Sequence, residues 1–393
     1  MNYDNSKKSL HGKAGKEELE NLLKGFEENQ FVKDIVKDYS VGYGSHDNNQ
    51  FKTHFLVQFL DNEQWIITST TSVRSDRTKG NQWEAYNIKQ LNKNVTRAIL
   101  TYPDGINEKE ELNAKSYNRK IQENNIYSEI TDVISISDLF DEIEQKVLQS
   151  KSPNSKRALE GNSFEKRLVV ILNNKGNLKK WNSQNSIEVG LQFPIFSMIL
   201  EAFGMKNDIS INKISATDKI SKLPSGGLPK TDVLIKFYFE NKPTQTYTVS
   251  CKRTRNNKVT IHEYSVDSFI KALCLEDKRL IESLRSLQKV GGPTALKNNY
   301  PPDYDYLNNN LINYINQLSK WVYGGIGGEG NPNEHWAYYI VSYNNELKEV
   351  SIYTIDDYIK QAKNIAGQFN TPFTWTYASG QKGKSLQLKG PVI

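Results

Sequence analysis

Cysteine is scarce in this 393-residue chain, which contains only two. Cys251 and Cys274 have neither CxxC spacing nor a neighbouring histidine cluster, so the common zinc motifs are excluded and a reduced protein is the simplest interpretation. Long apolar runs are also missing, and none approaches the roughly 20 residues that a membrane-spanning helix requires. The first segment, MNYDNSKKSLHGKAGK, lacks the apolar core of a signal peptide. We therefore predict a cytoplasmic protein that does not enter a membrane.

Neither sign of charge dominates, because 51 lysines and arginines stand against 45 aspartates and glutamates, for a net charge of +6. This mildly basic balance permits a polyanionic partner but does not establish one. Hydrophobic residues make up 37% and charged residues 24% of the chain, which is typical of a globular protein with a polar bias. The length allows two domains or one elaborated domain, with ample core.

Residues 1–150 are predicted to form an added N-terminal α+β domain, with a role in DNA binding, specificity or dimerisation. Leucines at helical spacing predict a short amphipathic helix over residues 17–26. Two β-rich runs predict an antiparallel hairpin over residues 51–71, and a further strand is expected at 95–102. A helix is predicted at residues 138–148, with Ser137 as its N-cap.

A polar segment after that hairpin, RSDRTKGNQW, is predicted to be a loop. Its Arg74, Arg77 and Lys79 suit contacts to DNA phosphates or bases. An internal ion pair between one of the arginines and Asp76 explains the composition equally well, and both interpretations stay open. The hairpin itself carries no lysine where a nuclease hairpin would need one, so no second active site is expected there.

The centre of the chain holds the pattern that carries chemistry. Residues 233–239 and 246–252 are rich in β-branched and aromatic residues and flank a turn that ends at Pro243, which predicts a second hairpin. This hairpin would bring Asp232 beside Ser250 and Lys252. A carboxylate that holds Mg²⁺ and a lysine that orients a water molecule are what a metal-dependent phosphodiesterase needs. Taken alone, the pattern also fits an ordinary surface hairpin with a solvated lysine.

Several ordered segments make the comparison more specific: GGLPKTDVLIKFYF, KVTIHEYSV, WTYASGQK and the final LKG. Together they resemble the MspI family of type II restriction endonucleases, within the PD-(D/E)xK nuclease superfamily, over about residues 157–390. The resemblance implies an α/β fold, in which a mixed sheet flanked by helices forms the nuclease core of a domain at residues 151–393. It also implies site-specific, Mg²⁺-dependent hydrolysis of double-stranded DNA that leaves 5′-phosphates.

The resemblance further implies the roles of individual residues. Asp232 would bind Mg²⁺ together with the backbone carbonyl of Cys251, and Lys252 would orient and activate the attacking water. Ser250 departs from the family, whose members carry Asn, or Asp or Glu in the wider superfamily, which puts the number of metals in doubt. Glu165, on a helix predicted from residue 157 to 172, is either a second acidic group at the centre or a solvated carboxylate.

Recognition is predicted in two places, of which the first follows the catalytic strand and the second lies near the C-terminus. The predicted DNA-binding residues there are Thr254, Arg255, Lys258, Thr260, Thr376, Ser379, Lys382 and Lys389. The resemblance assigns Thr260, Thr376, Ser379 and Lys389 to positions that reach base edges or their neighbourhood in the major groove. Lysine and arginine donate to guanine, and hydroxyls serve either partner, so together with the resemblance they favour a short G/C-containing site such as CCGG. Residues 260–264 are expected to begin a helix.

Double-stranded DNA is thus the predicted partner, with a cognate DNA methyltransferase as a functional partner and a homodimer as an option. The alternative is a catalytically weak DNA-binding protein that reads a sequence or a modified base. A nucleotide-binding enzyme is disfavoured, although residues 325–330 match GxGxxG, because this loop is predicted to follow a helix and precede a strand. His262 and His335 are interpreted as structural.

Overall fold

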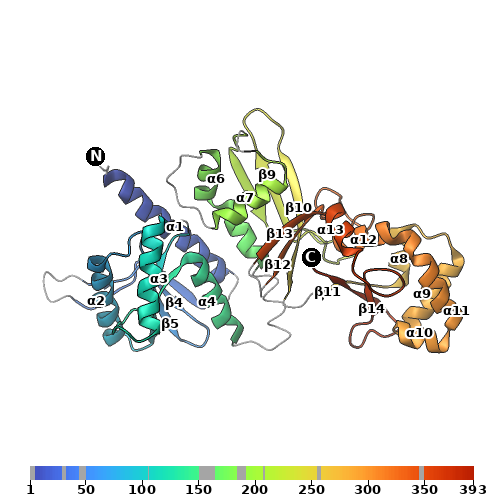
Figure 1. The fold of residues 1–393 in the computed structure, drawn as a ribbon, viewed down its shortest axis with the longest axis horizontal. Helices are drawn as coiled ribbons and strands as arrows, with labels where there is room; N and C mark the ends of the chain where they lie inside the picture. The colour runs from blue at the N-terminus through green and yellow to red at the C-terminus, as the bar shows by residue number, and fades with distance from the viewer. Residues whose placement is uncertain are drawn as a thin grey trace. The chain divides into compact units, whose positions relative to one another are not determined.

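The computed structural model describes residues 5–28, 32–43, 50–104, 106–149, 164–183, 192–206, 209–254, 258–344 and 349–393. The chain divides into two compact units (Figure 1). Unit 1 comprises Met1–Leu159, Lys166–Ser197 and Asn207–Ile211, and unit 2 comprises Glu160–Glu165, Met198–Lys206 and Asn212–Ile393. Within the described ranges, no helix combines the length and apolar character needed to cross a bilayer.

Unit 1 is built on a five-stranded sheet in the order β1-β4-β5-β6-β7. Its strands are β1 (Asp34–Lys37), β4 (Phe55–Gln58), β5 (Gln64–Ser69), β6 (Val95–Tyr102) and β7 (Asp132–Ser135). The first three run antiparallel, which confirms the predicted hairpin, whereas β5, β6 and β7 run parallel. Parallel neighbours need crossover connections, and these are the helices α2 (Ser75–Leu91) and α3 (Glu108–Gln122). The helix α4 (Ile136–Gln149) follows β7.

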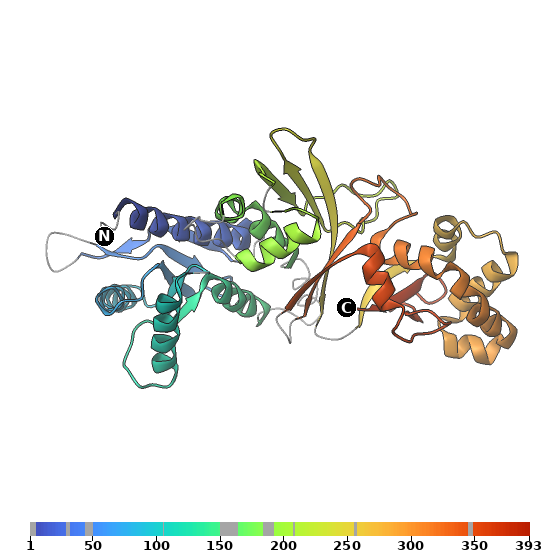
Figure 2. The ribbon, with the colours of Figure 1, turned by 45° about the horizontal axis from the view of Figure 1, so that its top comes forward.

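The first helix, α1 (Asn5–Glu28), is much longer than the predicted helix. The expected leucine stripe is present, with Leu19, Leu22 and Leu23 buried, but it occupies only the C-terminal half. Once that half is anchored, extending a helix costs less than starting one, and the preceding residues contain no proline. In Figure 2, α1 lies above the strands of unit 1 and the teal helix α3 lies below them.

The prediction of a loop at residues 74–83 is wrong, because Arg74 caps α2 and the helix begins at Ser75. The segment looks loop-like because only Thr78, Ala85 and Ile88 of the whole helix are buried, so its apolar stripe is too thin to show a helical period. The predicted N-cap of α4 is also displaced. The Ser135 hydroxyl accepts a hydrogen bond from the Asp138 amide at 3.0 Å, whereas Ser137 donates to the Asp104 carboxylate at 2.8 Å.

Unit 2 contains a second five-stranded sheet in the order β13-β12-β10-β9-β8. Its strands are β8 (Lys213–Thr217), β9 (Val233–Tyr238), β10 (Gln245–Thr254), β12 (Tyr339–Asn344) and β13 (Glu349–Thr354). The central hairpin predicted from the sequence is β9 and β10, paired with Val233 opposite Val249. Alternate side chains of β9, Val233, Ile235 and Phe237, are fully buried, so the other face of the hairpin is free to carry polar groups.

Unit 2 also contains a three-stranded sheet, β11-β15-β14, several helices inserted between β11 and β12, and α13 (Ile355–Ala362) after β13. Its strands are β11 (Lys258–Tyr264), β14 (Thr374–Thr376) and β15 (Leu386–Pro391). The expectation that residues 260–264 begin a helix is therefore wrong. Helix α8 starts only at Val266, and the preceding KVTIHEY run is a strand whose partner, β15, is distant in sequence.

Candidate active site and recognition surface

The carboxylate of Asp232 lies where β9 begins, beside the end of β10. Its backbone amide donates to the carbonyl of Val249 at 2.8 Å, which fixes the register of the hairpin at this point. The oxygen Oδ2 accepts hydrogen bonds from the Cys251 amide at 2.7 Å and from the Ser250 hydroxyl at 3.0 Å. The hairpin thus orients one carboxylate oxygen with two donors and leaves the other available for a ligand.

Lys252 joins the same network through Ser250. Its Nζ lies 2.5 Å from the Ser250 hydroxyl oxygen and 3.8 Å from Asp232 Oδ2. The Ser250 side chain is completely buried, whereas Lys252 and Asp232 keep 14% and 26% of their side chains exposed, enough for a substrate to reach them. Ser250 therefore connects the acid and the lysine, and its oxygen is engaged with both.

Two further groups at this site bear on metal binding. The Glu165 carboxylate, on the helix at residues 164–173, lies close enough for its charge to help raise the pKa of the Cys251 thiol, although burial is the main cause and Asp232 contributes more. That pKa lies well above its usual value, and Mg²⁺ takes oxygen ligands, so the backbone carbonyl is the ligand that Cys251 could offer. No cluster of three acidic, histidine or cysteine ligands occurs among the described residues. Two carboxylates and a carbonyl still fit Mg²⁺, which takes one or two carboxylates and completes its shell with water and phosphate.

A third charged group, Lys230, was not identified from the sequence. Its ammonium donates a hydrogen bond to the carbonyl of Ile261 on β11, and burial together with the nearby charge of Lys252 lowers its pKa to about 7. Lys230 thereby ties the segment before Asp232 to the strand that carries Thr260. The only sequence signal was its position two residues before the aspartate.

The three-stranded sheet gathers four of the eight predicted recognition residues on one face. Thr260 is opposite Lys389, and Lys389 is in turn opposite Thr374, so these three side chains form a row across the sheet. Lys258 reaches the same row, with its Nζ 3.3 Å from the Thr374 hydroxyl. Thr376 lies one pleat further along β14. Thr374 was missed because no sequence pattern indicates which residues pair.

The opposite face of this sheet is apolar, since Trp375, Leu386 and Leu388 are buried at 0 to 1% exposure. Ser379 and Lys382 are exposed in the turn after β14. Arg255 and the side chain of Thr254 lie outside the described residues. The polar face is thus supported by the apolar core beneath it.

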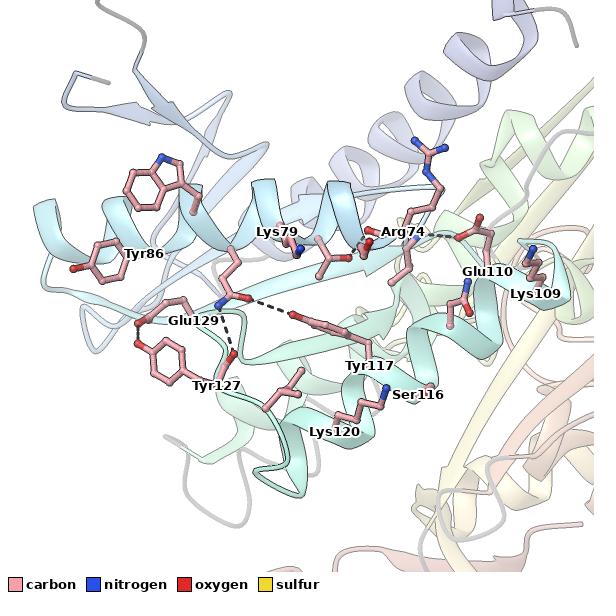
Figure 3. A pocket seen from close by; sticks show the side chains of 17 residues that line it. Arg74, Lys79, Tyr86, Lys109, Glu110, Ser116, Tyr117, Lys120, Tyr127 and Glu129 are labelled. Atoms are coloured by element: carbon pink, nitrogen blue, oxygen red, sulfur yellow. Dashed lines mark hydrogen bonds between the residues drawn. The ribbon is translucent and has the colours of Figure 1, made fainter. Parts of the chain in front are cut away.

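The cationic residues predicted in unit 1 separate into two places. Arg74 and Lys79 line a groove of about 1000 Å³ between α2 and α3, which Lys109 and Lys120 of α3 also line (Figure 3). Arg77 instead lines a smaller pocket, which also contains His54. Arg74 pairs with Asp76 at 3.1 Å, but both side chains are more than half exposed, so this pair contributes little to stability.

The glycine-rich loop follows α12 (Ile315–Gly324) and no helix opens after it before β12, which agrees with its rejection as a nucleotide site. His335 is buried and accepts a hydrogen bond from the Asn331 amide through Nδ1 at 2.9 Å. Its Nε2 lies 2.7 Å from the Ser221 hydroxyl. Both ring nitrogens are satisfied within the fold, so His335 is structural, while the side chain of His262 lies outside the described part.

Comparisons with known proteins agree with this geometry. Residues 141–390 match the family model "Restriction endonuclease MspI". The chain is 31% identical to the type II restriction enzyme BsuFI of Bacillus subtilis over a 401-residue alignment that covers 99% of both proteins. It is 29% identical to the type II restriction enzyme MspI of a Moraxella species, over 58% of this chain and 88% of that enzyme.

The crystal structure of MspI with its cognate DNA is similar in fold. It matches with a TM-score of 0.52 and 26% identity, over 65% of this chain and 98% of that one. The family model covers more than half of the chain, and the full-length relative extends the match through unit 1. The chain therefore belongs to the MspI family of type II restriction endonucleases.

Proposed function

We propose that this protein cuts double-stranded DNA at a short G/C-containing site, such as CCGG, by Mg²⁺-dependent hydrolysis that leaves 5′-phosphates. The observation that carries the proposal is the network of Asp232, Ser250 and Lys252 at the end of one hairpin. A cognate DNA methyltransferase would protect the host DNA, and a homodimer would place one hairpin on each strand of the duplex.

In this mechanism Mg²⁺, held by Asp232, the Cys251 carbonyl and Glu165, would supply charge stabilisation at the scissile phosphate. The Cys251 amide and the Ser250 hydroxyl fix the orientation of the Asp232 carboxylate. Lys252 is held by Ser250 and donates to the attacking water. The water oxygen forms the new bond to phosphorus and releases a proton to solvent. The bond to the 3′ oxygen breaks, this oxygen takes up a proton from solvent, and the 5′-phosphate remains on the downstream strand.

Specificity would come from the polar face of the three-stranded sheet. Lys389 can donate to guanine O6 and N7, and the hydroxyls of Thr260 and Thr376 can serve donors or acceptors in the major groove. Lys258, Ser379 and Lys382 would contact the adjoining backbone or base edges, as would Thr254 and Arg255. In unit 1, Arg74, Arg77 and Lys79 would add phosphate contacts.

Plasmid DNA incubated with the full chain and Mg²⁺ tests this function. Discrete fragments whose sequenced ends share one short site are expected, and EDTA should prevent them. A mobility shift of the same DNA without cleavage would favour the alternative, a catalytically weak DNA-binding protein.

A further inference from the structure

Unit 1 repeats the sheet that carries the active site in unit 2. In each sheet, four neighbouring strands are paired in the same way. The first pairs antiparallel with the second, the second pairs antiparallel with the third, and the third pairs parallel with the fourth. In unit 1 these strands are β1, β4, β5 and β6, and in unit 2 they are β8, β9, β10 and β12. Only the fifth strand differs, because β7 is parallel to its neighbour and β13 is antiparallel.

The match extends to single residues. Phe55 is opposite Ile67 in unit 1, as Val233 is opposite Val249 in unit 2. His54 precedes Phe55 by one residue, and Ser69 follows Ile67 by two. The Ser69 amide donates a hydrogen bond to His54 Nδ1 at 3.0 Å. The corresponding bond in unit 2 runs from the Cys251 amide to Asp232 Oδ2 at 2.7 Å. His54 therefore occupies the position of the catalytic carboxylate.

The other catalytic positions are also replaced. By the same register, Thr68 stands in the position of Ser250 and Thr70 in that of Lys252. Thr70 is nearly buried, and its hydroxyl donates to the carbonyl of Ser72 at 2.9 Å. With neither the carboxylate nor the lysine, this copy lacks the groups that would hold Mg²⁺ or orient water.

A pocket of about 560 Å³ nevertheless remains at this end of the sheet, and its charge differs from that of the active site. Lys13 and Lys16 from α1 and Arg77 from α2 line it together with His54 and one carboxylate, Glu84. Lys16 also forms an ion pair with Asp38, which lies outside the lining. Glu84 is already engaged by the Lys52 amide at 2.7 Å. Helix α1 can pack closely against Pro103 because residue 15 is glycine. A Cβ at this position would come within 2.7 Å of the Pro103 ring.

The protonation of His54 suits an anion. Because Nδ1 accepts from Ser69, the proton of the neutral ring lies on Nε2, which is then a donor. Burial and the charge of Lys16 lower its pKa, so the ring is neutral at physiological pH. The pocket thus offers an imidazole N–H and the cationic side chains of Lys13 and Arg77, with the charge of Lys16 nearby, a donor set that suits a phosphate.

We propose that unit 1 is a catalytically silent copy of the nuclease sheet, and that its His54 pocket binds a phosphodiester group of duplex DNA directly, without a metal ion. Where the active site pairs carboxylates with a cation to hold a phosphate, the copy uses cationic side chains instead. The enzyme thereby binds DNA at a second site, which has no cleavage activity. The proposal takes duplex DNA as its ligand from the proposed function but does not depend on cleavage.

The test uses the full chain with Asp232→Ala and a 20-base-pair duplex that lacks CCGG, in EDTA, with binding followed by fluorescence anisotropy across a series of salt concentrations. Adding Lys13→Ala and Arg77→Ala should weaken binding about tenfold or more and lower the salt slope by close to two, because each phosphate contact releases about one counterion. Both side chains are exposed, and neither forms an ion pair within the described part of the chain, so folding should be unaffected. A His54→Ala variant should weaken binding without changing the slope.

The matched control is Lys33→Ala with Lys93→Ala, two exposed cations at the opposite end of the same sheet. Equal affinity and slope in the control and the pocket variant would overturn the proposal. The proposal would also be overturned if inorganic phosphate raised the melting temperature of the parent but not of the pocket variant, while the two proteins bound DNA equally well. The ligand of the pocket would then be free phosphate. Cleavage of a CCGG duplex by the parent chain, with Asp232 intact, is measured separately and tests the proposed function, so a failure of that function is distinguished from a failure of this proposal.

Discussion

Thr260 and Lys389 lie directly opposite one another in the antiparallel pair of β11 and β15. Both side chains are exposed on the polar face of the sheet, so one protein surface combines a hydroxyl from the middle of the chain with an ammonium from its end. We expect Lys389→Ala to reduce the discrimination between the preferred site and sites altered at one base pair by about 1–3 kcal/mol, so that altered sites are cut relatively better. Digestion of a library of variant sites measures this. A uniform loss at every site would show that Lys389 contacts phosphate instead.

The network at the hairpin predicts that Asp232→Ala abolishes cleavage and leaves DNA binding largely intact. Removing the carboxylate eliminates charge stabilisation at phosphorus and also relieves its repulsion of the phosphate. Lys252→Ala should lose cleavage by several orders of magnitude. Single-turnover cleavage and anisotropy measure the two effects. Glu240→Ala, at the exposed turn of the same hairpin, is the control and should cut normally, and near-normal cutting by either active-site variant would refute their assigned roles.

Substitutions of Ser250 distinguish a positioning role of its hydroxyl from a direct role in catalysis. If its hydroxyl only holds Lys252 and Asp232 in place, Ser250→Ala should lower the cleavage rate modestly, whereas Ser250→Asn should restore a donor and an acceptor and keep activity. Rates at saturating Mg²⁺ for the two variants decide this. An alanine variant as inactive as Asp232→Ala would mean that the hydroxyl takes part in the reaction.

The buried carboxyl group of Asp104 predicts that the free energy of unfolding depends on pH. Burial raises its pKa from 3.8 to about 6 in the folded protein, against an opposing hydrogen bond from Ser137. A folded pKa above the unfolded one favours the native state only while the group is protonated, so this contribution is present below about pH 4 and is lost as pH rises through about 6. Asp104→Asn, whose amide oxygen can still accept from Ser137, should be more stable than the parent at pH 8 by up to roughly 3 kcal/mol and nearly equal at pH 4.

Urea unfolding at the two pH values measures this difference. The matched control is Asp61→Asn, because the hydrogen bond from Lys146 lowers the pKa of Asp61, and its neutral replacement should lose stability at pH 8. Equal behaviour of the two variants would contradict the assignment.

Local composition was enough to predict the β9–β10 hairpin, because β-branched residues on both sides of a proline turn specify it within one stretch of chain. The proximity of Asp232 to Lys252 followed from that hairpin alone. The strand β11 was mistaken for the start of a helix, since the strand that pairs with it comes from the far end of the sequence. The first half of helix α2 was mistaken for a loop, because the helix buries few residues and is required by the parallel pairing of its flanking strands. The correspondence of His54 with Asp232 depends on strand register, which no local pattern records.

The sheet that carries the polar face is assembled from two pieces of chain. Strand β11 lies in the insertion between β10 and β12, whereas β14 and β15 follow β13 at the C-terminal end. Natural exchange of one contiguous segment between relatives would therefore replace only part of the row formed by Thr260, Lys389 and Thr374, and leave mismatched neighbours across the pairing. New target sequences in this architecture should arise by paired point changes in β11 and β15 rather than by the transfer of a single block of sequence.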